Sequence, residues 1–218
     1  MGFSEKICVS VSEPDAGKAL AALKGIPFAE VRLDAMKAGA SEVRRIFSAK
    51  SVLIATCRPG AGRTDDERKS LLFAAIDAGA KYVDVEVDAS DAYKSEIAAA
   101  AKKKGCTLII SYHNYEKTPS RAELEQIVGW CFDSGAQIAK IACKSNSTQD
   151  NARLLGLLDS SRRLVVIGMG AKGKITRIAA PLLGSPFTFA SFGKGKETAE
   201  GQMGRKTLEK LMGVLEYG

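Results

Sequence analysis

The feature that most constrains the fold is an alternation, repeated eight times, between a short apolar run and a helix-like segment. The runs are rich in β-branched residues and begin a little over twenty to about thirty residues apart, the length of one βα unit. They cover residues 6–11, 28–34, 52–58, 82–88, 107–113, 137–143, 164–169 and 187–192. The predicted helices between them cover residues 15–23, 41–49, 65–78, 92–104, 121–134, 149–158, 175–183 and 203–215.

The pattern within each run indicates a parallel sheet. The runs are apolar on both faces, which is typical of strands covered on both sides. Glycines follow four of the predicted helices as C-terminal caps, at Gly25, Gly79, Gly105 and Gly135. Eight uninterrupted units with right-handed crossovers close most simply into a barrel, so we predict an α/β fold, a compact single-domain (β/α)8 TIM barrel over residues 1–218. An open doubly wound sheet is the alternative, but no G-x-G-x-x-G motif follows the first run.

Composition argues against several other classes of protein. The five cysteines are widely spaced with no C-x-x-C pair, which argues against a disulfide framework, and a single histidine, His113, excludes a multi-histidine metal site. No apolar stretch is long enough to span a membrane and no secretory signal is recognisable, so we expect a cytoplasmic protein with no membrane partner. The net charge is +7, but the basic residues are dispersed without interleaved aromatics, which favours an anionic small substrate over nucleic acid.

Polar residues at the ends of the second and third runs are candidates for function, because barrel chemistry lies at the C-terminal ends of the strands. Glu30 and Arg32 are two residues apart and therefore share one face of a strand. They are either substrate contacts or an internal ion pair. Arg58 ends the third run beside a Pro-Gly turn, which presents its guanidinium at the mouth of the barrel.

Acidic residues alternate with valines in the fourth run. Asp84, Glu86 and Asp88 lie on one face of the predicted strand and the valines on the other. In a barrel this pattern places two or three carboxylates inside, where they need cations. Arg32 and Arg58 are available to pair with them.

A solitary histidine ends the fifth run. A histidine in such a position is ordinarily a structural residue held by hydrogen bonds. His113, however, lies at a strand end in the same ladder as Arg58 and Glu86. That position favours a functional role.

The sixth run carries the sharpest anomaly, a lysine in the middle of an apolar strand. Lys140 shares a face with Ile138 and Ala142, and lysine is almost never fully buried without a partner. Burial and nearby arginines would disfavour its ammonium form and provide the neutral amine that imine formation requires. The alternative is a structural lysine paired with Glu86 or Glu30.

Two segments together resemble type I 3-dehydroquinate dehydratases, a (β/α)8 family of Schiff-base enzymes in the shikimate pathway of aromatic amino-acid biosynthesis. The first is Asp84-x-Glu86 followed, about twenty residues later, by the IISYHN sequence of residues 109–114. The second is the AKIA sequence of residues 139–142, at the matching distance from His113. The resemblance covers nearly the whole chain, from residue 7 to about 211.

The resemblance implies a reaction and roles for particular residues. The enzymes of this family eliminate water from 3-dehydroquinate to give 3-dehydroshikimate, without a metal or organic cofactor, and the family analogy suggests a homodimer. Lys140 matches the imine-forming lysine and His113 the acid and base. Residues with substrate-binding matches are Glu30 and Arg32 of an E-x-R motif, Arg58 of a T-x-R motif, Arg177 after an M-G segment, and Thr198 and Gln202 of a lid.

The chain departs from the family pattern at three places. Thr198 and Glu200 stand where the family lid usually has Ser and Pro, so lid closure is open to question. Gly62 occupies the place of a Glu that, in many members, hydrogen-bonds the histidine; we expect Glu86 to supply that contact. Residues 193–196 have the composition of a mobile lid.

Two other functions remain open at this stage. A Schiff-base barrel acting on a sugar phosphate is compatible with the glycines after the seventh run, where barrels often bind phosphate. A basic barrel that binds nucleic acid or a metabolite is the non-enzymatic alternative. Tolerance of Lys140→Ala would favour the latter.

Overall fold

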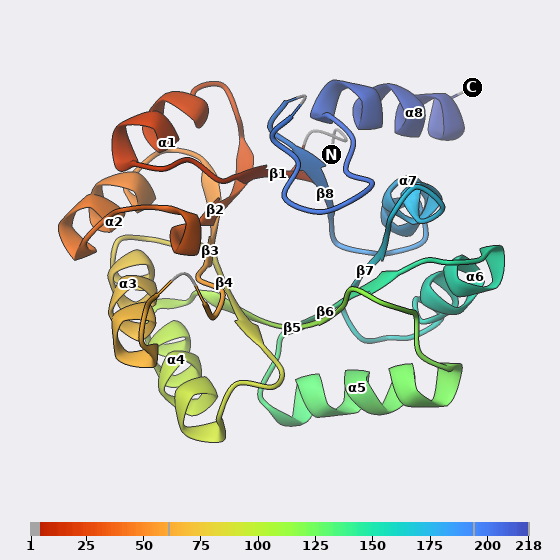
Figure 1. The fold of residues 1–218 in the computed structure, drawn as a ribbon, viewed down its shortest axis with the longest axis horizontal. Helices are drawn as coiled ribbons and strands as arrows, with labels where there is room; N and C mark the ends of the chain where they lie inside the picture. The colour runs from red at the N-terminus through yellow and green to blue at the C-terminus, as the bar shows by residue number, and fades with distance from the viewer. Residues whose placement is uncertain (1–4, 61, 194, 218) are drawn as a thin grey trace.

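The polypeptide forms a barrel of parallel strands surrounded by helices in a computed structural model that describes residues 5–60, 62–193 and 195–217 (Figure 1). The strands are β1 (Ile7–Val11), β2 (Phe28–Arg32), β3 (Val52–Thr56), β4 (Tyr82–Glu86), β5 (Thr107–Asn114), β6 (Ile138–Lys144), β7 (Leu164–Met169) and β8 (Thr188–Ser191). The helices are α1 (Ala16–Ala22), α2 (Ala40–Phe47), α3 (Asp65–Asp77), α4 (Asp91–Lys104), α5 (Arg121–Asp133), α6 (Thr148–Gly156), α7 (Lys174–Leu182) and α8 (Arg205–Tyr217). A short 3₁₀ turn, Leu33–Ala35, follows β2.

All strands belong to one parallel sheet in the order β7-β6-β5-β4-β3-β2-β1-β8. Within the described residues no strand pairing joins β7 to β8, so the barrel has one seam. At this seam the carbonyl of Phe189 in β8 accepts a hydrogen bond from Arg177 of α7, at 3.2 Å. The predicted (β/α)8 barrel is confirmed, with this opening between its last two strands.

Three strands end two residues earlier than their apolar patterns predict. The structure ends β2 at Arg32, β3 at Thr56 and β4 at Glu86. The chain turns at once after β2, because the Asp34 carboxylate accepts hydrogen bonds from the side chain of Arg32 and from the backbone N–H of Arg58. Asp88 therefore falls outside β4, so that of the two or three carboxylates expected on this strand it carries two, Asp84 and Glu86.

Capping residues explain where the helices begin and end. Ser120 caps α5 through the backbone N–H of Glu123, which reciprocates in a capping box. The four predicted glycine caps have positive φ angles; Gly105, with φ of 67°, ends α4 in the left-handed conformation that glycine adopts without strain. Among the described residues, no helix combines the length and apolar character needed to cross a bilayer.

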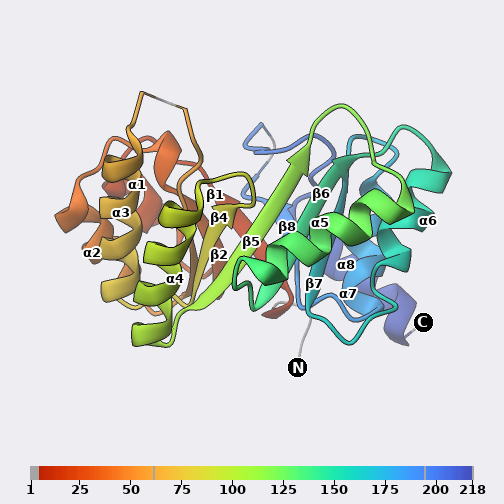
Figure 2. The ribbon, with the colours of Figure 1, turned by 90° about the horizontal axis from the view of Figure 1, so that it is seen from below.

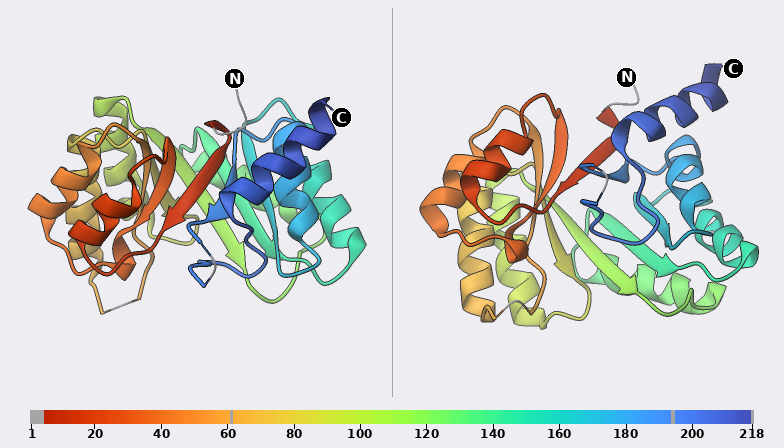
Figure 3. Two further views of the ribbon diagram at one scale, coloured as in Figure 1. Left: turned by 90° about the horizontal axis from the view of Figure 1, so that it is seen from above. Right: turned by 45° about the horizontal axis from the view of Figure 1, so that its top comes forward.

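The barrel interior is divided into an apolar floor and a polar mouth. The floor includes Phe28, Tyr82 and Phe187, whose ring centroids lie 5.1–5.8 Å apart. The mouth is at the C-terminal ends of the strands, where the segment between β8 and α8 also lies (Figures 2 and 3). The floor closes one end of the barrel, so chemistry is confined to the other.

All five cysteines are free and buried, as expected of small hydrophobic residues.

Candidate active site

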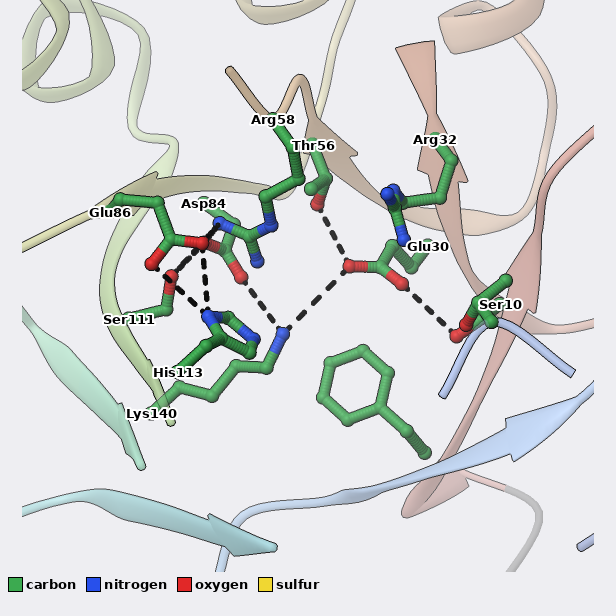
Figure 4. Close-up of polar contacts among 12 residues, drawn as sticks. Ser10, Glu30, Arg32, Thr56, Arg58, Asp84, Glu86, Ser111, His113 and Lys140 are labelled. Atoms are coloured by element: carbon green, nitrogen blue, oxygen red, sulfur yellow. Dashed lines mark hydrogen bonds and ion pairs between the residues drawn. The ribbon is translucent and has the colours of Figure 1, made fainter. Parts of the chain in front are cut away.

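Charged side chains from five strands and the turns after them meet at the polar mouth (Figure 4). Strand register puts them at matching heights, since Arg32 pairs with Thr56 and Thr56 with Asp84. On the other side of β4, Glu86 pairs with Ser111 and Ser111 with Lys140. The sequence spacing thus converts directly into proximity across the sheet.

Lys140 is buried at the centre of this group, with 5% of its surface exposed. Its Nζ donates to Oδ2 of Asp84 at 3.2 Å, lies 3.9 Å from Oε1 of Glu30 and sits 4.4 Å from the centroid of the Phe189 ring. Of the two partners considered for a structural lysine, Glu30 lies within ion-pair distance, whereas Glu86 contacts His113 instead. A buried lysine between two carboxylates and an aromatic face is held in one place.

Asp84 is the hub of a network that includes Arg58. Arg58 Nη1 lies 2.9 Å from Oδ1 of Asp84 and 2.8 Å from Oε1 of Glu86, and the hydroxyl of Ser111 donates to the same Oδ1 at 2.6 Å. Burial alone would raise the pKa of the Asp84 carboxyl, but the charges of Arg58 and Lys140 outweigh it and hold that pKa well below its usual range. Asp84 is therefore an anion at all ordinary pH values.

His113 contacts Glu86 as the sequence predicts. Its Nδ1 lies 2.9 and 3.1 Å from the two oxygens of the Glu86 carboxylate. This contact favours the tautomer with the proton on Nδ1, which leaves Nε2 with a lone pair. Burial and the charge of Arg58 lower the pKa of His113 below its ordinary value, against the opposing effect of Glu86. The imidazole is therefore neutral near pH 7 and able to accept a proton. Gly62 cannot hydrogen-bond His113 as the glutamate expected at that position would. Glu86 makes this contact from β4 instead.

Glu30 is held by two hydroxyl groups. Ser10 Oγ donates to its Oε2 and Thr56 Oγ1 to its Oε1, each at 3.0 Å. The ion pair considered for Glu30 and Arg32 does not form. Ser10 was missed by the sequence analysis, although it is a polar residue in an apolar run and pairs in register with Glu30.

Arg32 pairs with Asp34 and not with the acids of β4. Its Nε and Nη2 donate to the two oxygens of Asp34 at 3.0 and 2.7 Å. The expectation that Arg32 neutralises the Asp84 and Glu86 carboxylates is wrong, because the turn after β2 places a closer acid beside it. Of the two arginines, it is Arg58 that contacts those two carboxylates.

Arg177 has the opposite environment. It is 1% exposed, and its one hydrogen bond goes to the Phe189 carbonyl, whereas Nε and Nη2 have no partner among the described residues. Burial lowers its pKa to about 10. A buried cation without a counter-ion is costly, which makes the site around it a receptor for an anion.

Thr198 and Gln202 cover the mouth from the segment between β8 and α8. Gln202 Oε1 accepts from the backbone N–H of Thr198 at 2.8 Å, and its Nε2 donates to Thr198 Oγ1 at 3.1 Å and to Ser10 Oγ at 3.3 Å. The segment is thereby tied to β1, the strand that pairs with β8.

Two ion pairs join the same segment to the barrel. Glu200, which stands in place of the family's Pro, contacts Nζ of Lys144 at the end of β6. Lys196 pairs with Glu13, which follows β1, at 3.0 Å. Lys194, within the predicted mobile lid, lies outside the described residues.

One cavity of about 60 Å³ gathers most of the predicted residues. Those that line it are Glu30, Arg32, Arg58, His113, Lys140, Arg177, Thr198 and Gln202. Glu86 does not line this cavity; it lies behind His113, on the wall of a separate groove beside α4 and α5. Ser10 and Tyr115 line the cavity and were missed.

Comparison with known proteins places this site in a family. The family model described as type I 3-dehydroquinase matches residues 7–217. The chain belongs to the type I 3-dehydroquinase family. The predicted resemblance is confirmed, and so is the predicted enzyme class: a carbon–oxygen lyase of the 3-dehydroquinate dehydratase type.

Relatives and solved structures agree with this assignment. The chain is 37% identical over 227 residues to 3-dehydroquinate dehydratase of Methanothermobacter thermautotrophicus, covering 98% of each chain. It is 34% identical to that of Methanocaldococcus jannaschii, covering 96% of this chain and 99% of the relative. The crystal structure of the enzyme from Aquifex aeolicus has a TM-score of 0.79 and 28% identity, with 97% of this chain and 99% of that chain covered.

More distant structures share the fold alone. A type I enzyme from Clostridium difficile has a TM-score of 0.85 at 24% identity, covering 99% of this chain and 93% of that one. A 3-hexulose-6-phosphate synthase has a TM-score of 0.59 at 16% identity, covering 96% of this chain and 98% of that one. The family match therefore favours the dehydratase over the sugar-phosphate alternative.

Proposed function

We propose that the protein dehydrates 3-dehydroquinate to 3-dehydroshikimate through an imine on Lys140, as a step of the shikimate pathway. The observation that carries this proposal is a single cavity that holds a buried lysine, a neutral histidine and an unpaired buried arginine. Family membership and the names of the relatives support the choice of substrate.

Lys140 performs the first step. Its Nζ bonds to the ketone carbon of the substrate, and the ketone oxygen leaves as water. The resulting protonated imine withdraws electrons and makes the hydrogen on the neighbouring carbon acidic. Burial of the lysine beneath the covering segment keeps bulk water away from this intermediate.

His113 performs the proton transfers. Its Nε2 takes the acidic proton, and the same proton then goes to the departing β-hydroxyl, which leaves as water. A water molecule then hydrolyses the product imine, which restores the ketone and the free amine of Lys140. Glu86 fixes the tautomer and stabilises the transient imidazolium from behind. General acid–base catalysis of this kind contributes about 10²–10⁴-fold to the rate.

Arg177 binds the substrate carboxylate. Its unpartnered Nε and Nη2 provide two donors, an arrangement suited to a bidentate grip. Thr198 and Gln202 close over that end of the substrate, while Glu30, Arg32 and Arg58 contact the ring hydroxyls and set the position of Lys140.

The remaining expectations belong to the same proposal. We infer a single catalytic domain over residues 1–218 that works without a metal or organic cofactor, in the cytoplasm and as a homodimer. Its partner is the small substrate, and neither nucleic acid nor a membrane takes part. A small carboxylate ligand is supported by Arg177, which is buried and lines a small cavity rather than the surface.

An activity assay tests the proposal. Dehydration conjugates a new C=C bond with the ketone, so the product is followed by its ultraviolet absorbance. Purified protein should convert 3-dehydroquinate with this signature, and Lys140→Met should not. Turnover that survives in Lys140→Met would contradict the imine mechanism, and no turnover in the folded wild type would contradict the substrate.

A further inference from the structure

Asp84 is the carboxylate nearest to the lysine nitrogen among the described residues. Its Oδ2 lies 3.2 Å from Nζ of Lys140, against 3.9 Å for the Glu30 oxygen. The Asp84 side chain is fully buried. The roles given so far to Lys140 and His113 do not use it.

The two oxygens of Asp84 are used differently. Oδ1 accepts from Arg58 and from Ser111, at 2.9 and 2.6 Å, whereas Oδ2 faces Lys140 (Figure 4). Arg58 and Ser111 also contact each other, at 3.0 Å, so the carboxylate cannot rotate without breaking this triangle. One end of Asp84 is anchored and the other is aimed at the reacting nitrogen.

Glu30 is less suited to the same task. Its oxygens already accept from Ser10 and Thr56, and its distance from Nζ exceeds hydrogen-bonding range. Glu30 lines the cavity, where substrate hydroxyls can reach it. Asp84 does not line the cavity and remains behind Lys140.

We propose that Asp84 is a further catalytic residue, the counter-ion of the protonated imine on Lys140. Its Oδ2 accepts the N–H of the imine and keeps that proton in place. This inference rests on the imine mechanism proposed above. It assigns to Asp84 a contact with the reacting nitrogen itself.

The proton balance shows why such a counter-ion matters. The attacking group is the neutral amine of Lys140; its two N–H protons and one proton taken up from solvent supply the two hydrogens of the water that leaves and the one that stays on the imine nitrogen. If that proton were lost, the neutral imine would be a weak electron acceptor and elimination would slow. An anion 3.2 Å from the nitrogen opposes this loss.

Other charged groups also face the imine nitrogen and set its basicity. Glu30 from β2 adds to the effect of Asp84, while Arg58 after β3 and Arg177 of α7 oppose it. His113 of β5 opposes it only when protonated. Because these groups remain in a variant of Asp84 alone, a change in that variant reports the missing carboxylate.

Borohydride trapping as a function of pH tests the inference. Borohydride reduces the protonated imine, so trapping of 3-dehydroquinate on Lys140 falls at alkaline pH as the imine loses its proton. In Asp84→Asn the half-point of this fall should move to lower pH by about 1–3 units, because an anion that favoured the charged form is gone. Asp88→Asn removes the same charge just beyond β4, outside the cavity, and should leave the half-point unchanged.

A second variant has the opposite sign. Ser111→Ala removes a hydrogen bond from Oδ1 and leaves more negative charge for the imine, so the half-point should rise by a few tenths of a unit. It also serves if Asp84→Asn does not fold. An unshifted half-point in folded Asp84→Asn, or a lower half-point in Ser111→Ala, would overturn the inference about Asp84. The trapping itself would still support the proposed imine mechanism. No trapping in the wild type would overturn both.

Discussion

Two arginines on opposite walls of one cavity have contrasting environments. Arg58, which follows β3 and is largely buried, contacts Asp84, Glu86 and Ser111, and the charges of the two carboxylates raise its pKa in spite of desolvation. Arg177, at the seam between β7 and β8, has one backbone carbonyl as a partner and a lowered pKa. The charge of Arg58 is neutralised by carboxylates of the protein. The charge of Arg177 is neutralised only when an anion binds beside it. Under the proposed function, Arg177 binds the substrate carboxylate, whereas Arg58 holds the carboxylates around Lys140 and His113 in place.

Removing the reactive amine of Lys140, in β6, should have the largest effect. We expect Lys140→Met to lower kcat on the order of 10⁴-fold or more, because no other lysine of the described residues lines the cavity. The substitution should leave the affinity for a substrate-like carboxylate within a few-fold of the wild type, since Arg177 is untouched. Steady-state kinetics measure kcat, and a binding titration measures the affinity for the carboxylate. Loss of both turnover and affinity in this variant would show that catalysis and carboxylate binding do not depend on separate residues.

The two arginines should differ in their effect on folding. Arg58→Met leaves Asp84 and Glu86 buried with a missing cation and should lower the free energy of unfolding by about 3–5 kcal/mol. Arg177→Met removes an unpaired buried charge and should leave that free energy unchanged or higher. Urea unfolding of the ligand-free proteins measures both.

Arg177→Met should weaken substrate binding although it does not destabilise the fold. Arg177→Met should lower kcat/KM by a factor equivalent to about 2–5 kcal/mol, chiefly through KM. Stabilisation of the protein by the substrate carboxylate should disappear in the same variant. An Arg177→Met protein that is less stable and binds normally would mean that the arginine is structural.

Glu86, which contacts both Arg58 and His113, should control the pH dependence of the reaction. It opposes the lowering of the His113 pKa, so Glu86→Gln should lower that pKa further. The base is active when neutral, and activity is lost as pH falls through this pKa; the acid limb of kcat/KM should therefore move to lower pH. Turnover should fall about tenfold to a hundredfold, because the imidazolium loses its stabilising anion. An unchanged pH–rate profile and turnover would remove Glu86 from the mechanism.

The ion pair between Glu200 and Lys144 should have the smallest effect. Both side chains are partly exposed, and such pairs contribute about 0–1 kcal/mol. Glu200→Gln and Lys144→Met should each raise KM by at most about fivefold, the double variant no more than either, and the effect should vanish at high salt. Strictly additive effects in the double variant would show that the pair does not hold the lid segment.

The sequence was informative wherever a residue's environment follows from its strand position. The eight βα units, the buried Lys140 and the proximity of Glu86 to His113 all depend on the alternation of strand faces, which can be read along the chain. Ion-pair partners could not be predicted in this way. Arg32 pairs with Asp34 because of a turn after β2, and the alternation says nothing about turns.

The isolation of Arg177 was also beyond the sequence. It depends on the seam between β7 and β8, which leaves the Phe189 carbonyl free to accept its hydrogen bond. Strand pairing at the point of barrel closure depends on the whole fold rather than on one segment. The role of Asp84 was hidden for a similar reason, since an acid on an inward face does not reveal which cation it meets.

The central claim is that the chemistry passes through an imine on Lys140. The most direct test is the intact and peptide mass of the protein after incubation with 3-dehydroquinate and borohydride. We predict one reduced adduct per chain, mapped to the peptide that contains Lys140. An adduct on another lysine, or none in protein shown to be folded, would contradict the account.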